Sequence, residues 1–242
     1  MTLLPLKEGK IWHYKGKVIT TDYPNSGRWD SVFPLRHENT YLAKKLAVKK
    51  GDNVLDLCTG SGIIAIFAAE KAGKVYATDI NPRALLFAEF NSKMNGTENK
   101  IEFRQGDLFG PVKGMKFDLI TANPPFEPVP KEAGYYLHSA GGEKGTKVLE
   151  KILSDIENHL KPGGSFQIIA WIPESKMPVL EKITKENYEN IIIKTLRIFS
   201  PEEMREYLGK MAISDINISE PTRYLFIQGF GYKVVADCTT KG

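Results

Sequence analysis

The stretch Asn53-Val54-Leu55-Asp56-Leu57-Cys58-Thr59-Gly60-Ser61-Gly62 decides the fold that the sequence predicts. Its apolar first half has the pattern of a buried strand, and its glycines turn the chain into a helix predicted over residues 63–71. Glycine lets the backbone approach a ligand more closely than a residue with a Cβ can. A strand, a glycine turn and a helix in this order predict a ligand site at a strand's carboxyl end.

Strand and helix patterns alternate along the rest of the chain. Further strands are predicted at 74–79, 101–106, 117–122 and 165–171, and helices at 81–95 and 144–160, the latter ended by Lys161-Pro162-Gly163-Gly164. After Pro173 we expect a helix, a strand at 191–199, a helix capped by Ser200 and a β region at about 216–235. This alternation predicts an α/β fold, with a doubly wound, mostly parallel sheet covered on both faces.

The N-terminal part of the chain has a different pattern. Residues 10–14 and 17–20 alternate as short strands around a Lys15-Gly16 turn, and a helix is predicted over 41–47 with Asn39 or Thr40 as its N-cap. We therefore divide the chain into a small N-terminal β extension, residues 1–38, which is a candidate substrate-binding segment, and a main domain, residues 39–242.

The composition is that of a globular protein, with 42% hydrophobic and 26% charged residues and a net charge of +4. No apolar run approaches the length of a membrane helix and no signal-peptide pattern is present, so we expect a cytoplasmic protein without a membrane partner. Two distant cysteines and four scattered histidines have no metal-ligand spacing, so no metal is expected.

Positive charge is concentrated in the first fifty residues, which hold ten Lys and Arg against four Asp and Glu. These basic side chains alternate with aromatic ones: Trp12, Tyr14, Tyr23, Trp29, Phe33 and Tyr41. Such a mixture suits a single-stranded nucleic acid surface, and it suits a solvated lysine-rich face over a small aromatic core equally well.

Three acids lie at or just beyond the ends of three successive strands. Asp56 lies at the junction of the first strand with the glycine loop, Asp79 ends the second strand, and Asp107 follows the third. The main alternative is a dinucleotide site, because Gly60-Ser61-Gly62-Ile63-Ile64-Ala65 satisfies Gly-x-Gly-x-x-Gly/Ala and Asp79 follows near the expected distance. A carboxylate at Asp56 would pair with an ammonium group and repel a pyrophosphate, which favours a cationic ligand. Each acid is also explained singly by a helix cap or a turn.

The tetrapeptide Asn123-Pro124-Pro125-Phe126 follows the fourth strand. The two prolines fix φ and remove backbone donors, and Asn123 adds a side-chain carbonyl. Phe126 adds a flat apolar face, and the Asn123 and Pro124 carbonyls are two candidate acceptors beside it. This group suits a planar ligand that carries an NH₂ group; the alternative is an Asx-Pro turn that ends a strand.

Asn-Pro-Pro-Phe resembles the Asn/Asp-Pro-Pro-aromatic signature of class I S-adenosylmethionine-dependent methyltransferases that alkylate planar amino groups. The 56–62 loop resembles the family's Asp-x-Gly-x-Gly-x-Gly, with Cys58 at the first glycine, a position we expect to be undemanding. The resemblance implies a seven-stranded Rossmann-like sheet with a C-terminal antiparallel hairpin and S-adenosylmethionine as cofactor. It implies cofactor-binding roles for Asp56, Thr59, Gly60, Gly62, Asp79, Ile80, Asp107, Leu108 and Asn123, and catalytic roles for Asn123, Pro124, Pro125 and Phe126.

The acceptor is less clear from the sequence. Residues 34–40 and 136–145 are loosely similar to two segments of the release-factor glutamine methyltransferases, Pro-Arg-x-(Asp/Glu)-x-Thr and Ala-x-x-Gly-Gly-x-Asp-Gly, with Lys144 in place of the latter's Asp. Phenylalanine at position 126 and the basic extension look more like the RNA base-amine enzymes. We rank an RNA base first, a protein glutamine second and a small molecule third. A catalytically silent S-adenosylmethionine-binding subunit is the alternative outside the enzymes.

Overall fold

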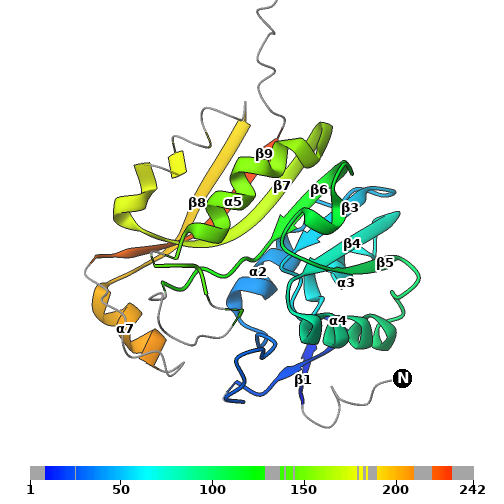
Figure 1. Ribbon diagram of the computed structural model, residues 1–242, viewed down its shortest axis with the longest axis horizontal. Coiled ribbons are helices and arrows are strands. Elements are labelled where there is room, and N and C mark those ends of the chain that lie inside the picture. The colour runs from blue at the N-terminus through cyan, green and yellow to red at the C-terminus, as the bar shows by residue number, and fades with distance from the viewer. Residues whose placement is uncertain are drawn as a thin grey trace, which may run out of the picture.

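A computed structural model describes residues 9–24, 26–128, 137–138, 140–143, 145–178, 180–181, 184, 190–209 and 220–230. Seven strands form one sheet in the order β5-β4-β3-β6-β7-β9-β8 (Figure 1). They are β3 Asn53–Leu57, β4 Lys74–Asp79, β5 Ile101–Gln105, β6 Phe117–Ala122, β7 Leu160–Pro173, β8 Asn190–Phe199 and β9 Thr222–Phe230. The first five are parallel, and β9 lies antiparallel between β7 and β8. The predicted seven-stranded sheet with a C-terminal antiparallel hairpin is confirmed.

Alternate residues of each strand enter two separate cores, one on each face of the sheet. Val54 and Leu119 pack on the face covered by α2, His37–Lys45, and α3, Ile63–Ala68. Leu55 and Ile120 pack on the opposite face against α5, Lys147–Asp155. The near-continuous apolar runs of β3 and β6 follow from this burial on both faces.

A two-stranded hairpin, β1 Gly9–Tyr14 and β2 Lys17–Asp22, is packed beside α4, Pro82–Met94 (Figure 1). Two amide side chains of the α4 segment join it to β2. Asn91, which is fully buried, bonds the backbone N–H and C=O of Thr20 at 2.8 and 2.9 Å. Asn95 bonds the backbone N–H and C=O of Val18 at 3.0 and 2.7 Å. Asn91 also donates to the Ser61 carbonyl at 2.8 Å, so it links the hairpin to the glycine loop. The predicted N-terminal β extension is confirmed; the division at residue 38 stays a prediction.

The predicted start of α2 was wrong by four residues. The helix begins at His37, and Asn39 lies in its first turn, where its side chain accepts a 3.0 Å hydrogen bond from the Arg36 N–H. A polar residue at the third helical position that bonds back to the N-cap N–H is the second half of a capping box. The N-cap is Arg36, so the expected N-cap at Asn39 or Thr40 was wrong; Asn39 contributes the capping-box hydrogen bond from inside the helix.

The predicted helix over 144–160 is shorter than expected. It is α5 followed by a 3₁₀ turn, η2, at Ile156–His159, and the Lys161-Pro162-Gly163-Gly164 segment belongs to β7. Gly163 has a left-handed backbone (φ +74°), and the β6–β7 register shifts between Phe117 and Leu119. The glycines thus make a bulge at the start of a long strand where we expected a turn.

The remaining elements agree in part with expectation. Short 3₁₀ turns are η1, Gly110–Val112, and η3, Glu174–Lys176. Helix α7, Pro201–Gly209, is capped by Ser200, whose Oγ accepts from the Glu203 N–H at 3.2 Å as predicted. Residues 216–219 and 231–235 of the predicted β region lie outside the described residues. No helix in the described part of the chain has the length and apolarity that crossing a membrane requires.

Candidate active site

A cavity of about 240 Å³ lies at the carboxyl ends of β3, β4, β5 and β6. It brings together residues that the sequence predicted from four separate loops: Asp56, Thr59, Gly60, Asp79, Ile80, Asp107, Leu108, Asn123, Pro124, Pro125 and Phe126. Because parallel strands end at one edge of the sheet, local strand patterns were sufficient to predict this gathering. Their individual roles stay predictions.

Asp56 is held rigidly at the floor of the cavity. It is 1% exposed, and its two oxygens accept hydrogen bonds from the hydroxyls of Thr121 and Thr59 at 2.8 and 2.6 Å. Burial raises the pKa of Asp56 to about 7, against the opposing effect of the two hydroxyls. A nearby cation would stabilise the ionised carboxylate and reverse that shift.

Asp79 ends β4, and two backbone donors fix it in place. Its Oδ2 accepts from the Gly60 N–H at 2.8 Å, and its Oδ1 accepts from the Asn81 N–H at 2.9 Å. Burial also raises the pKa of Asp79. Each carboxylate oxygen can accept a second hydrogen bond, so the pair can receive two adjacent ligand hydroxyls.

Asp107 lies at the exposed end of the cavity. Its side chain is 61% exposed, and Lys151 approaches its Oδ2 at 3.3 Å. The apolar side chain of Ile80 is 54% exposed although it lines the cavity. Leu108 has a left-handed backbone (φ +45°), and its carbonyl accepts from the Thr78 hydroxyl at 3.2 Å. Ile80 and Leu108 give this end the apolar surfaces that a flat heteroaromatic ring needs.

The glycine loop differs from expectation at two positions. Cys58 has φ +55°, a region that residues with a Cβ rarely adopt, so the first glycine position of the motif is demanding, contrary to our expectation. Gly62 is not among the described residues that line the cavity. A Cβ on Gly62 would lie 2.9 Å from the Ala88 Cβ of α4, so this glycine serves the packing of α3 against α4.

Asn123 follows β6 and differs from the acids. Its Oδ1 is buried, and no donor among the residues that the structure describes bonds to it. Buried carbonyl oxygens without a partner are rare and costly in folded proteins, and they require an explanation. Since Asn123 lines the cavity beside Pro124 and Pro125, a ligand N–H is the natural donor.

The loop that carries Asn123 is supported from both sides. Phe126 stacks on Trp171 of β7, with the ring centroids 5.1 Å apart and the planes 3° from parallel. Gly145 lies directly against the Phe126 carbonyl, and the Gly141 N–H donates to the Glu127 carbonyl at 2.9 Å. A side chain at either glycine would collide with this backbone. The 136–145 similarity therefore marks a support for the acceptor loop.

Sequence reasoning missed the side of the cavity that the N-terminal part builds. Ser31, Val32, Phe33 and Asn39 line it, as does His138 beyond the acceptor loop. Burial lowers the pKa of His138 to about 4, so its ring is neutral near pH 7. Asn39 and His138 lie inside the two loosely similar segments, residues 34–40 and 136–145, but nothing in the local sequence shows that these positions line the cavity, because contacts distant in sequence bring them there. Cys58 also lines the cavity, whereas His37 lies against Tyr224, with Nδ1 3.3 Å from the Tyr224 hydroxyl.

Residues 38–191 match the family model described as the methyltransferase small domain. The chain belongs to this family. As a member it is a methyltransferase, and the predicted fold, enzyme class and cofactor, S-adenosylmethionine, are confirmed.

Three relatives of this methyltransferase carry names that specify glutamine methylation. A Methanocaldococcus jannaschii protein, provisionally named a protein N5-glutamine methyltransferase, is 37% identical over 143 residues, which is 57% of this chain and 71% of the relative. The ribosomal protein uL3 glutamine methyltransferase of Bradyrhizobium diazoefficiens is 39% identical over 47% of this chain and 39% of the relative. The release factor glutamine methyltransferase of Koribacter versatilis is 38% identical over 47% and 44%. These matches thus span less than half of either bacterial relative.

Solved structures support the fold of the methyltransferase over nearly its whole length. TYW2 of Methanocaldococcus jannaschii, solved with AdoMet, has a TM-score of 0.61 at 14% identity and covers 93% of this chain and 87% of its own. The tRNA m1G37 methyltransferase of the same organism has a TM-score of 0.54 at 18% identity, covering 93% and 57%. At such identities the likeness shows the fold alone.

The residues of the methyltransferase's cavity fit S-adenosylmethionine. Buried acids suit its ammonium and sulfonium charges and would repel the pyrophosphate of a dinucleotide. Asp79 offers two oxygens for the ribose hydroxyls, and the exposed Ile80 with Leu108 offers apolar surface for the adenine. The dinucleotide alternative therefore fits neither the family nor the charge of the cavity.

Proposed function

We propose that this protein methylates the side-chain amide nitrogen of a glutamine in a protein, with S-adenosylmethionine as the methyl donor. The observation that carries this proposal is the buried Asn123 Oδ1, which accepts no hydrogen bond from the described residues and lines the same cavity as Asp56 and Asp79. An incoming NH₂ group would satisfy it. The acceptor loop and the cofactor acids thus share one enclosed space.

The relatives favour glutamine over the RNA base that we ranked first from the sequence. Three of them, at 37 to 39% identity, carry names that specify glutamine methylation. The tRNA m1G37 methyltransferase is similar in fold at 18% identity, which says nothing of the acceptor of this chain. The 136–145 loop that packs on Phe126 adds a second similarity to the glutamine enzymes. RNA stays the second candidate on the strength of the basic N-terminal segment.

The chain's own residues would position the amide. S-adenosylmethionine, when bound, supplies a methyl group on a positively charged sulfur, which a nitrogen lone pair can attack. Asn123 Oδ1 and the Pro124 carbonyl would accept the two amide N–H bonds, draw the nitrogen toward tetrahedral geometry and localise its lone pair. The methylated nitrogen carries one surplus proton, which would pass to water as the product leaves, because an amide oxygen such as Asn123 Oδ1 accepts a hydrogen bond but is too weak a base to take the proton. The two prolines fix these acceptors before the substrate arrives.

Phe126 would exclude water from the acceptor. One face of its ring is fixed by Trp171, and at 9% exposure the residue still lines the cavity. The cavity acids Asp56 and Asp79 would hold the cofactor's ammonium and ribose, as their geometry suggests. No covalent enzyme intermediate is needed, because positioning and electrostatics suffice for a direct transfer.

The experiment offers methyl-labelled S-adenosylmethionine with cellular protein freed of RNA and, separately, with RNA freed of protein. We expect label in the protein pool, and mass spectrometry should place one added methyl group on a glutamine side chain. A peptide from that site should accept label, and its glutamine-to-glutamate version should not, since glutamate lacks the NH₂ group. Label in RNA alone would overturn the glutamine proposal and make RNA the acceptor. Label in neither pool would favour a silent subunit or a small-molecule enzyme.

A further inference from the structure

The segment that links β2 to α2 forms one wall of the cofactor cavity. Ser31, Val32 and Phe33 all line the cavity, although they belong to the N-terminal part of the chain. Val32 is 2% exposed and packs with Ala84 and Phe87 of α4. We call residues 31–33 the wall. Its position relative to α4 sets the width of the cavity beside the cofactor acids.

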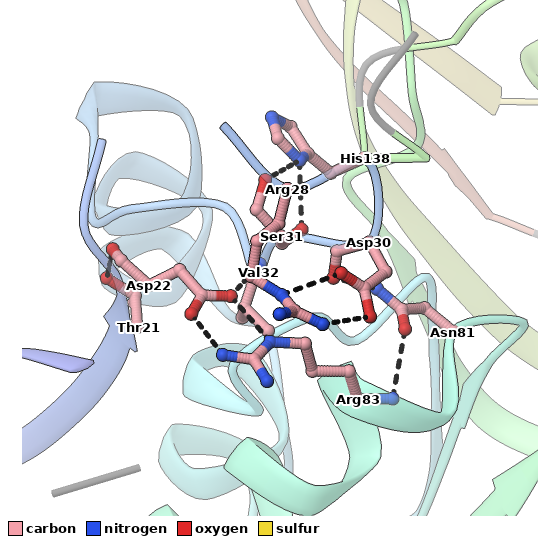
Figure 2. A network of polar contacts seen from close by, with 9 residues as sticks. All are labelled: Thr21, Asp22, Arg28, Asp30, Ser31, Val32, Asn81, Arg83 and His138. Carbon is pink, nitrogen blue, oxygen red and sulfur yellow. Dashed lines mark hydrogen bonds and ion pairs between the residues drawn. The ribbon is translucent and has the colours of Figure 1, made fainter. Parts of the chain in front are cut away.

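A single buried carboxylate fastens the wall to α4. Asp22, the last residue of β2, is 1% exposed and accepts from the Val32 N–H at 2.8 Å. The same carboxylate receives the forked guanidinium of Arg83, with Nε at 3.0 Å and Nη2 at 2.5 Å (Figure 2). Arg83 lies in the first turn of α4 and is 7% exposed. A paired fork of this kind fixes both distance and orientation.

A second contact joins the chain before the wall to a cofactor acid. The Asn81 side chain donates to the Asp30 carbonyl at 2.8 Å, while the Asn81 backbone N–H donates to Asp79 Oδ1 at 2.9 Å. Asn81 is also the N-cap of α4, since its Oδ1 accepts from the Arg83 N–H at 2.9 Å (Figure 2). Asn81 therefore connects Asp30, which precedes the wall, with Asp79 and with helix α4.

A third contact joins the wall to the far side of the acceptor loop. His138 Nδ1 lies 3.0 Å from the Ser31 carbonyl (Figure 2). A carbonyl oxygen only accepts, so Nδ1 carries the ring proton in this contact. The Leu137 N–H donates to the Trp29 carbonyl at 2.9 Å. The wall thus bridges the cofactor side and the acceptor side of the cavity.

We propose that Asp22 is a positioning residue for the cofactor: through Arg83 and the Val32 N–H it holds the wall at the distance from Asp79 that cofactor binding requires. Asp22 itself is absent from the described residues that line the cavity, so it acts through the wall and does not touch the ligand. This inference rests on the cavity being the S-adenosylmethionine site, and it is independent of the identity of the acceptor.

The test compares Asp22→Asn with wild type by calorimetric titration with S-adenosylhomocysteine, a readout that needs no acceptor. Asparagine keeps the shape and one oxygen but leaves the Arg83 charge without its carboxylate. We expect the dissociation constant to rise on the order of tenfold, because small displacements of positioning groups have effects of that size or larger. The KM for S-adenosylmethionine should rise in parallel, while kcat at saturation stays within about threefold.

The matched control is Asp118→Asn. Asp118 also accepts from one backbone N–H, that of Asn53 at 2.8 Å, and from one cation, Lys161 at 2.7 Å, but it lies at the amino end of the sheet. It is more exposed than Asp22, with a side-chain exposure of 33%. We expect the Asp118→Asn variant to have a lower melting temperature and an unchanged dissociation constant for S-adenosylhomocysteine. Equal weakening by both variants would assign Asp22 a merely structural role.

Two further variants keep the inference testable if Asp22→Asn folds poorly. Arg83→Lys keeps the charge and loses the fork, and it should give an intermediate dissociation constant. The double variant Asp22→Asn/Arg83→Gln replaces the ion pair by an amide pair, and it should recover part of the affinity lost in Asp22→Asn, because it leaves no buried charge unpaired. If wild type binds S-adenosylhomocysteine and all three variants bind it with the same dissociation constant, the inference is overturned. Absent binding in wild type overturns the cofactor assignment instead.

Discussion

The two sides of the cavity differ in how the protein satisfies their polar atoms. On the cofactor side, Asp56 receives two hydroxyls and Asp79 receives two backbone N–H groups, so each oxygen of these two buried carboxylates has a donor before any ligand binds. On the acceptor side, Asn123 Oδ1 is buried and has none among the described residues. Under the function that we propose, the difference separates a site whose acids are fixed in advance from one that the substrate itself completes.

This contrast has an energetic meaning. A buried carbonyl without a partner costs about 1–3 kcal/mol of folding free energy. The internal donors of Asp56 and Asp79 offset part of the cost of burying these acids, although burial still raises the pKa of both and so disfavours their ionised forms. Active sites store such costs where they raise activity. The acceptor side should therefore trade stability for turnover, whereas the donors on the cofactor side should hold the acids in place and lower the cost of burying them. Substitutions on the two sides test this difference.

The largest effect is expected from Asn123→Ala. Turnover should fall by about 10²–10³-fold, the scale measured when one preorganised hydrogen-bonding group is removed. The dissociation constant for S-adenosylhomocysteine should stay near the wild-type value, and the melting temperature should stay equal or rise, because an unsatisfied buried carbonyl is removed. Asn123→Asp keeps an acceptor oxygen and should retain more turnover. Near wild-type turnover in Asn123→Ala would remove the acceptor role of this residue.

Asp79→Asn should differ from Asn123→Ala in both stability and cofactor affinity, each of which should fall. An asparagine NH₂ would face either the Gly60 or the Asn81 N–H, so one backbone donor loses its acceptor and stability falls by about 1–3 kcal/mol. The dissociation constant for S-adenosylhomocysteine should rise by about 10–100-fold, since hydrogen bonds to a charged group each contribute about 1.5–3 kcal/mol. Thermal unfolding and calorimetry check both quantities. If this variant were as stable as Asn123→Ala, the two sides would not differ in the way described.

The sequence predicted one side of this cavity much better than the other. Asp56, Asp79, Asp107 and the Asn123 loop each end a recognisable strand, and strand order alone brings strand ends together at one rim. The wall is different, because Arg83 has the appearance of an ordinary surface residue of a helix in the sequence. Only the packing of the hairpin on α4 buries it against Asp22. Such a contact joins residues 61 positions apart and leaves no local pattern.

Backbone conformation was the second source of error. The sequence shows that Cys58 replaces a glycine, but it does not show that this position has φ +55°. Likewise, the sequence does not show that Gly62, which fits the cofactor motif, lies in close contact with Ala88 of α4; its cofactor role stays a prediction. A glycine motif combines ligand contacts with packing requirements, and only coordinates separate the two.

The smallest effect, and the most specific, is the pH dependence of cofactor binding. Burial raises the pKa of Asp56 to about 7 in the free protein. Below this pH the carboxyl group is neutral and cannot pair with an ammonium, so affinity should increase as pH rises toward 7 and then level off. The expected slope is about tenfold per pH unit below the pKa, and binding at pH 6 should release close to one proton. Calorimetry in buffers of different ionisation enthalpy measures that release.

The variant Thr121→Val tests whether Asp56 is the group that controls this pH dependence. The Thr121 hydroxyl donates to Asp56 Oδ1 and lowers the pKa of that carboxyl, and Thr121 is not among the described residues that line the cavity. Valine has nearly the same shape, so the wall and floor should stay in place while the carboxylate loses one donor. The pKa of Asp56 should rise further, and the pH at which affinity levels off should move upward with it. If the midpoint stayed fixed or moved to lower pH, a group other than Asp56 would control the affinity, and the contrast between a rigid cofactor side and an incomplete acceptor side would lose its electrostatic basis.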